Sequence, residues 1–314
     1  MQLVEKQVID RADLRFAALD SACFASKNLY NAALYEVRQV YIIEGRYLNY
    51  NEMDRRMQSH EAYKALPAKV AQQVLLLLEK NWKSFFEAMK AYNVDPSRFR
   101  RRPQLPRYKH KTMGRNVLIY TIQAISRSKR ILGRHLIQPS GLAVQIKTRQ
   151  DPKSIAQVRI VPKYGFVVVE IIYEQEPRCR ACDPALIAGI DPGLDNVIAL
   201  TASKPGFVPV IVNGRGLKST NQFYNKTMAQ LQQELGRPGF TRRMERLTIW
   251  RNRRIEHDLH TISRFVIDLL VAEGIGTLAI GRNVGWKTGD PPGQTDESEL
   301  RSGASCPAYS HAYL

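Results

Sequence analysis

The stretch Leu186–Ala202, LIAGIDPGLDNVIALTA, decides how the second half of the chain folds. Two apolar runs flank Asp191 and the dipeptide Pro192-Gly193, a pattern that predicts two strands joined by a tight turn. Asp191 ends the first strand, and its carboxylate has two possible roles. Either it accepts a hydrogen bond inside the turn, or the sheet presents it to a metal ion such as Mg²⁺. Asp195, four residues later, is predicted to cap the turn.

The residues after this hairpin extend the pattern to a whole sheet. A third apolar run, VPVIVNG, follows the turn Lys204-Pro205-Gly206 and predicts a third strand. Two amphipathic segments follow and predict helices, and Thr277–Gly281, TLAIG, predicts a fourth strand. Three strands, a helix and a strand are the opening order of an RNase H-like fold, so the second helix is expected to be an insertion.

The N-terminal half combines helices with β-structure. Apolar residues recur at spacings of three and four between Pro67 and Tyr92, which predicts a long helix, and Phe16–Tyr41 is predicted to be helical as well. From Leu136 to Tyr173 the apolar period becomes two, with a hairpin at residues 162–165. We expect a small β-barrel with a helical lobe, and a linker at Glu174–Pro184. The fold class is therefore α+β or α/β.

The charge of the chain points to a polyanionic partner. Lys and Arg number 47 against 29 Asp and Glu among the 314 residues, which gives a net charge of +18 and a pI of about 9.9. Nucleic acid is the simplest partner for such an excess, and an ordinary cationic surface is the alternative.

Two clusters concentrate this charge. Arg98–Lys111, RFRRRPQLPRYKHK, has seven basic residues among fourteen and includes two aromatic residues, so phosphate contacts and base stacking are predicted there. The alternative interpretation is a solvated basic loop. A second basic cluster lies on the later predicted long helix, and there the alternative is an ordinary solvent-exposed helix face. The candidate nucleic-acid-binding residues are Arg100, Arg101, Arg102, Arg107, Tyr108, Lys109, Lys111, Arg251, Arg253 and Arg254.

Cysteine usage and hydropathy predict a reduced, cytoplasmic protein. The N-terminus MQLVEKQVID lacks the apolar core of a signal peptide, and the longest aliphatic run, Val74–Leu78, is far short of the roughly 20 residues that span a bilayer. Four cysteines argue against a disulfide framework. Cys179 and Cys182 form a single C-x-x-C without a second pair, and Cys306 is isolated, so no zinc site is predicted.

The segment AGIDPGLDNVIAL resembles the first RuvC motif of the TnpB, or OrfB-type, family of insertion-sequence proteins, which are related to type V CRISPR nucleases. Five further segments match in the family's order: SKNLYNAALYEVRQ, AQQVLLLLEKNWKSFFEAM, RRRPQLPRYKHK, VNGRGLKSTNQFYNK and TLAIGRNVGWK. The resemblance implies an N-terminal β-barrel and helical lobe that grip a guide RNA and target DNA, followed by a RuvC-like domain that cuts DNA with Mg²⁺.

This resemblance also implies residues and partners. It makes Asp191 the first metal-binding carboxylate of a Mg²⁺-dependent endonuclease, and thus the candidate catalytic residue. The implied partners are a guide RNA and double-stranded DNA with a short flanking motif, in a bacterial or archaeal cytoplasm and in association with the nucleoid. No membrane partner is expected.

The chain departs from the family at two places. The family usually has a Glu at the end of the fourth strand, where this sequence has Gly281. Some relatives with this IG-N-GWK pattern carry a displaced Glu further on, but here the resemblance stops after Lys287. The family's zinc ribbon and its last Asp would lie beyond that point. Residues 288–314 contain one basic residue, Arg301, and are predicted to be disordered; their four acidic residues are Asp290, Asp296, Glu297 and Glu299.

These observations predict three regions and leave several functions open. The regions are a nucleic-acid-binding lobe (1–185), a partial RuvC domain (186–287) and a non-family tail (288–314), so that the chain is a C-terminally truncated relative. The main hypothesis is a TnpB-like protein that binds guide RNA and DNA without cleaving the DNA, because one carboxylate does not hold two metal ions. The alternatives are an active nuclease that uses tail or partner carboxylates, a non-enzymatic RNA-guided repressor, and a frameshifted remnant.

Overall fold

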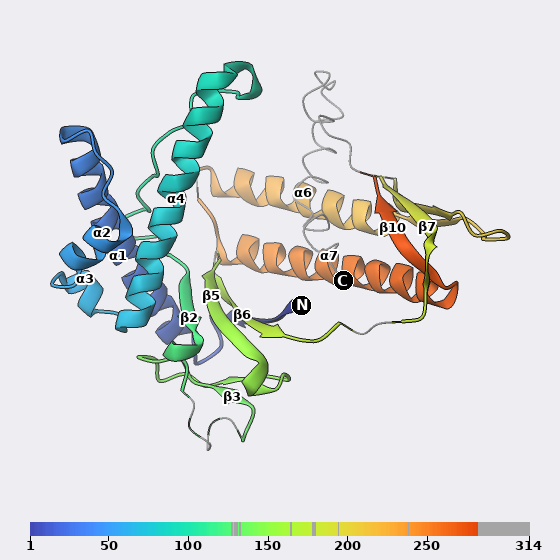
Figure 1. Ribbon diagram of the computed structural model, residues 1–314, viewed down its shortest axis with the longest axis horizontal. Helices are drawn as coiled ribbons and strands as arrows, with labels where there is room; N and C mark the ends of the chain where they lie inside the picture. Colours follow the sequence, from blue (N-terminus) through green and yellow to red (C-terminus); the bar gives the residue numbers. More distant parts are fainter. Residues whose placement is uncertain are drawn as a thin grey trace. The chain divides into compact units, whose positions relative to one another are not determined.

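The computed structural model describes residues 1–281 except 127, 129, 130, 132, 164, 178, 179, 194 and 238. The chain forms two compact units, Met1–Pro177 and a second that begins at residue 178 (Figure 1). The tail 288–314, predicted to be disordered, lies outside the described residues. In the described part, no helix is both long and apolar enough to cross a membrane.

Four helices follow the first strand of unit 1: α1 (Phe16–Ile43), α2 (Tyr50–Met57), α3 (Glu61–Lys64) and α4 (Ala68–Val94). The two long helices confirm the predictions for 16–41 and 67–92. The apolar stripe of α4 is buried from Val70 to Trp82, because its residues return to one face every three or four positions. Asp95 and Pro96 end α4 as predicted, and a 3₁₀ turn, η1 (Pro96–Arg98), follows.

The strands of unit 1 form an open antiparallel sheet in the order β1-β6-β5-β2. Their bounds are β1 (Gln2–Asp10), β2 (Leu118–Thr121), β5 (Ile155–Pro162) and β6 (Phe166–Glu174). The predicted hairpin at 162–165 is confirmed, since it joins β5 to β6.

The predicted N-terminal β-barrel is not confirmed, because no sheet of the described residues closes on itself and β1 and β2 remain edges. The alternating run around Leu142–Ile146 was expected to supply barrel strands. It forms only β4 (Ile146–Lys147), which pairs with β3 (Leu136–Ile137) as a separate two-stranded sheet. Strands of two residues are too short to bridge the two edges of the larger sheet.

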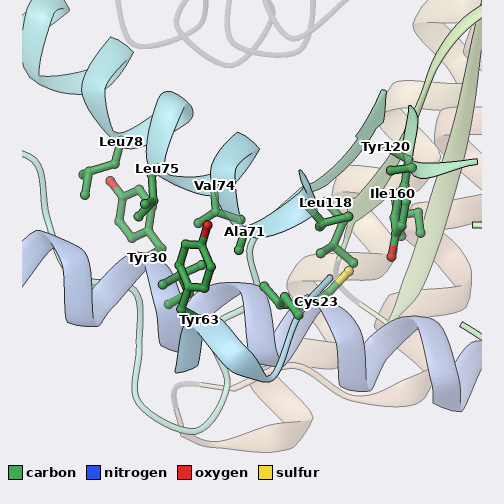
Figure 2. Packing of buried hydrophobic residues seen from close by; sticks show 14 of the residues in the cluster. Cys23, Tyr30, Tyr63, Ala71, Val74, Leu75, Leu78, Leu118, Tyr120 and Ile160 are labelled. Carbon is green, nitrogen blue, oxygen red and sulfur yellow. The ribbon is translucent and has the colours of Figure 1, made fainter. Parts of the chain in front are cut away.

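The core of unit 1 lies where α1 and α4 pack against each other and against the sheet (Figure 2). Cys23 and Tyr30 of α1 face Leu75 of α4, Leu118 of β2 and neighbouring side chains. Desolvation by burial raises the pKa of the Cys23 thiol to about 12, so this cysteine is protonated and acts as a small apolar core residue.

Unit 2 contains the elements predicted for residues 186–281, in the predicted order. They are β7 (Asp183–Pro192), β8 (Asn196–Ala202), β9 (Val210–Asn213), α6 (Arg215–Leu235), α7 (Arg242–Ala272) and β10 (Ile275–Ile280). The sheet order is β10-β7-β8-β9, in which β10 runs parallel to β7 and the other pairs are antiparallel. This arrangement agrees with the expected opening of an RNase H-like fold.

One face of this sheet is covered by α7. Val266 and Leu270 of α7 pack against Ala188, Ile190 and other apolar side chains. Successive strand residues point to opposite faces, so Ile187 and Asp191 project from the other face, where both are exposed. The helices α6 and α7 lie side by side (Figure 1) and form a second small core.

We expect unit 2 to unfold before unit 1. Its two cores are smaller than the single core of unit 1 in the described part of the chain, and β10 is an edge strand there. Limited proteolysis with a non-specific protease, read by mass spectrometry, should accumulate a fragment close to residues 1–177. Persistence of a 186–281 fragment while unit 1 is digested would contradict this expectation.

Candidate functional site

Asp191 is positioned by the end of β7 and is exposed. The turn that follows is closed by the backbone, since the Gly193 N–H donates to the Val197 carbonyl at 3.4 Å. Within the described residues the Asp191 carboxylate has no hydrogen bond or ion pair. The carboxylate is therefore not used to hold the turn, and it is available to a ligand.

Asp195 does not cap this turn but connects it to the next helix. Its carbonyl accepts a hydrogen bond from the Gly214 N–H at 2.8 Å, and its Oδ1 accepts one from Lys218 Nζ at 3.1 Å. The prediction of a turn cap is thus wrong, because Gly214 and Lys218 at the start of α6 lie within reach.

Gly281 lies beside Asp191, at the end of the neighbouring parallel strand. Ile280 pairs with Ile190 in the register of β10 and β7, and the Gly281 N–H donates to the Ile190 carbonyl at 2.8 Å. A Cβ at Gly281 would lie 3.6 Å from Asp191 Oδ1 and 3.2 Å from the Ile190 oxygen. Position 281 is therefore a place from which a second side chain would reach any metal held by Asp191.

The described residues do not fit a two-metal centre. Mg²⁺ takes six oxygen ligands, and two such ions need several converging carboxylates. No group of three or more His, Cys, Asp or Glu side chains in residues 1–281, with the gaps given above, could hold a metal ion. The tail carboxylates Asp290, Asp296, Glu297 and Glu299, and the cysteines Cys179 and Cys306, lie outside the described residues.

The basic segment 98–111 in unit 1 is extended as predicted, and its last part is held on α1 by side chains. Asn31 forms a two-way pair with the backbone of Lys109: the Lys109 N–H donates to Oδ1 at 2.9 Å, and Nδ2 donates to the Lys109 carbonyl at 2.8 Å. The buried Lys27 donates from Nζ to the Lys111 carbonyl at 2.6 Å. These contacts fix the backbone of residues 109–111, which argues against a freely solvated loop there.

Two cation–aromatic contacts reinforce this attachment. The Arg38 guanidinium lies over the Tyr108 ring at 5.1 Å, and Lys109 Nζ lies over the Tyr30 ring at 5.0 Å. Burial lowers the pKa of the Lys109 ammonium. Lys109 is therefore an anchor of the segment, whereas Tyr108 keeps 44% of its surface exposed.

Five other candidate residues of the segment face solvent. Arg100, Arg101 and Arg102 are exposed, as are Arg107 and Lys111. Arg107 also donates a hydrogen bond to Gln104 Oε1. These five side chains are free to contact phosphates, and they are carried by a backbone whose end is docked on α1.

The candidate residues on α7 differ in availability. Arg251 donates from Nε and Nη2 to Asn221 Oδ1 at 2.8 and 2.6 Å and lies over the Tyr224 ring at 5.5 Å, so it joins α7 to α6. Arg254 Nε lies 3.3 Å from Asp258 Oδ2, and both Arg253 and Arg254 are exposed. Arg253 and Arg254 can meet a ligand, while Arg251 mainly holds the two helices together.

Sequence reasoning missed the residues of α1 that hold the basic segment. Lys27, Asn31 and Arg38 are polar residues spaced by four and seven positions on a helix whose buried residues are mostly apolar. That spacing places them on one face, which indicates a polar partner for this face of α1. The identity of the partner segment, about 80 residues away, is not readable from the spacing.

A comparison with protein families matches residues 170–287 to OrfB_IS605, described as a probable transposase. The matched region runs from β6 through the Asp191 turn, α6 and α7 to position 287. Over these residues the chain is similar to this transposase family. No curated protein matches the chain.

Two solved structures are similar to this chain. A cryo-EM structure of a Cas12f1-sgRNA-target DNA complex matches with a TM-score of 0.47 and 11% identity, covering 90% of this chain and 66% of that chain. A CRISPR-Cas12f ternary complex matches with a TM-score of 0.29 and 11% identity, covering 92% of this chain and 69% of the other. The chain thus spans about two thirds of the length of either protein.

We expect Asn31→Ala to release the end of the basic segment from α1. Losing both hydrogen bonds to Lys109 costs about 1 kcal/mol, which corresponds to roughly fivefold faster amide exchange over residues 108–112. Hydrogen–deuterium exchange measures this directly. Asn28→Ala, on an exposed position of the same helix, is the matched control and should leave the exchange unchanged. Equal exchange in both variants would show that Asn31 does not hold the segment.

We expect Gly281→Glu to create a second ligand beside Asp191. The new carboxylate should strengthen Mn²⁺ binding, used as a probe for Mg²⁺, about tenfold or more in an electron paramagnetic resonance titration. Gly281→Gln is the control, because it has the same shape and meets the same Ile190 oxygen without adding charge. Tightening in the Gln variant, or tightening that survives Asp191→Ala, would contradict a site shared by positions 191 and 281.

Proposed function

We propose that this chain is a TnpB-type protein that binds a guide RNA and a double-stranded DNA target with a short flanking motif, and does not cleave the DNA. The observation that carries the second half is Gly281, which stands beside Asp191 without a side chain. The guide RNA and the DNA target are what the resemblance to TnpB/OrfB-type proteins implies, and the match of residues 170–287 to a probable transposase family supports that resemblance.

The charge distribution supports the binding half of the proposal. The net charge of +18 includes the exposed arginines 100–102, which project from a segment docked on α1. Such contacts neutralise phosphates and provide affinity that is independent of sequence. In RNA-guided proteins base pairing reads the target, while the protein reads the shape of the duplex and a short flanking motif. An exposed basic segment that contacts phosphates is consistent with a protein that recognises duplex shape and leaves the reading of the target to base pairing.

The ligand requirement of metal-assisted hydrolysis supports the second half. Two ions must be held close enough to activate water and stabilise the leaving oxygen, which takes several carboxylates. Asp191 by itself offers one or two oxygen ligands, and Gly281, its neighbour on the paired strand, has no side chain to offer one. We therefore infer weak binding of Mg²⁺ and no assembled hydrolytic centre in the described residues.

A second candidate is an active Mg²⁺-dependent, RNA-guided endonuclease. It is favoured by the exposure of Asp191 and by the lack of any described partner that occupies its carboxylate. Carboxylates outside the described residues, or from a partner, would have to complete the site.

The phosphate contacts are tested by removing the three adjacent arginines. For R100A/R101A/R102A we expect weaker binding to a 30-base-pair duplex, and a slope of log K against log salt that is reduced by about 2 to 3. The matched control is R46A/K83A/K90A, which removes three positive charges of unit 1 that are each ion-paired with a glutamate. An unchanged slope in the arginine variant, or equal losses in both, would contradict the assigned contacts.

The proposed function as a whole is tested with RNA that copurifies with the protein and DNA complementary to that RNA. We expect RNA-dependent binding of the matched duplex, and intact DNA after incubation with Mg²⁺. Cleavage that is abolished by Asp191→Ala would establish the nuclease instead. Absence of RNA-dependent DNA binding would overturn the binding half.

A further inference from the structure

An exposed pair of aromatic rings joins α6 to α7. Phe223 of α6 and Trp250 of α7 meet edge to face, with ring centroids 5.7 Å apart and an interplanar angle of 77°. Phe223 keeps 55% of its surface exposed and Trp250 keeps 46%. Large aromatic side chains contribute most when they are buried, so two that meet at the surface and stay half open indicate a binding role.

The contacts around the pair hold it in place. Next to Phe223, Tyr224 shares a hydrogen bond of 3.1 Å with Thr248 and lies under the Arg251 guanidinium. Arg251 in turn donates to Asn221 of α6. The residues adjacent to both rings are thus bonded across the two helices, which reduces the conformational entropy that a ligand would otherwise have to remove.

The surface around Trp250 is positively charged. Arg246, Arg253 and Arg254 lie four before, three after and four after Trp250, so they share its face of α7, and all three are exposed. Lys226 is three positions after Phe223 on α6 and is exposed as well. The single acidic residue among 242–254 is Glu245, which is buried.

We propose that Phe223 and Trp250 form a stacking platform for unpaired bases of a single-stranded nucleic acid, whose phosphates are met by Arg246, Arg253 and Lys226. Aromatic rings flanked by cations bind single strands because each base offers a π-face, whatever its identity. A duplex keeps its bases stacked inside and would use only the charges. An acidic polypeptide would likewise use the arginines without needing the rings.

This platform is made of residues of unit 2, whereas the basic segment 98–111 belongs to unit 1. The proposed platform rests on the proposed function only in taking nucleic acid as the partner. It adds a distinct ligand, an unpaired strand. An RNA-guided protein opens a duplex and leaves one DNA strand displaced, so a site for single strands has a use in that reaction.

The test compares three fluorescent probes in anisotropy titrations of the full chain: a 15-residue oligothymidylate, an abasic strand of the same length, and a 15-base-pair duplex. We expect Trp250→Ala to weaken oligothymidylate binding about 5- to 150-fold and to leave binding of the abasic strand and the duplex unchanged. Trp250→Phe, which keeps a ring, should retain most of the affinity.

Phe265→Ala is the matched control, since Phe265 is 48% exposed on the same helix outside the pair. It should leave all three affinities unchanged. Thermal melting of each variant identifies any loss of folding. Unchanged oligothymidylate binding in the Trp250→Ala variant, or an equal loss for the abasic strand, would overturn the platform.

The outcomes separate this proposal from the proposed function. The R100A/R101A/R102A variant should lose affinity for the duplex and the abasic strand, which Trp250→Ala does not affect. A base-dependent effect of Trp250→Ala without any RNA-dependent DNA binding would retain the platform and reject the RNA-guided function.

Discussion

The parallel pairing of β10 with β7 determines the chemistry available in unit 2. Parallel strands that pair in register bring their carboxyl ends to one edge of a sheet, and here they bring position 281 to Asp191. A rigid sheet holds this geometry whatever the side chains are. Glycine at position 281 therefore changes the set of metal ligands without changing the fold. The backbone φ of Gly281 is not positive, so the backbone conformation does not require glycine there.

The two units use charge in different ways. In unit 1 the arginines project from an extended segment whose last residues are bonded to α1 through Asn31 and Lys27. In unit 2 the arginines lie on a helix, where one is committed to the contact with α6 and others surround exposed rings. Net charge predicts a polyanionic partner in both cases, but only the local setting separates a phosphate contact from a structural one.

The fold was largely predictable from the spacing of apolar residues. The stripe of α4, the hairpin of β5 and β6, and the order from β7 to β10 all follow from local periodicity, which acts within a few residues along the chain. The barrel prediction failed because closure depends on which strands are long enough to pair at the edges. The alternating run near Ile146 forms a strand of only two residues, β4, which pairs with β3 and not with an edge of the four-stranded sheet.

The sequence by itself determined the elements, the excess of basic residues, the family pattern around Asp191 and the glycine at 281, because these are properties of residue type and local spacing. Only the tertiary structure decided which of these residues meet. It placed Gly281 next to Asp191, bound Lys109 to Asn31, engaged Arg251 with Asn221, and left Phe223 and Trp250 exposed together. The physical reason is that these contacts join residues 27 to 90 positions apart, and the packing of helices and the register of strands, rather than local propensity, bring such residues within a few ångströms.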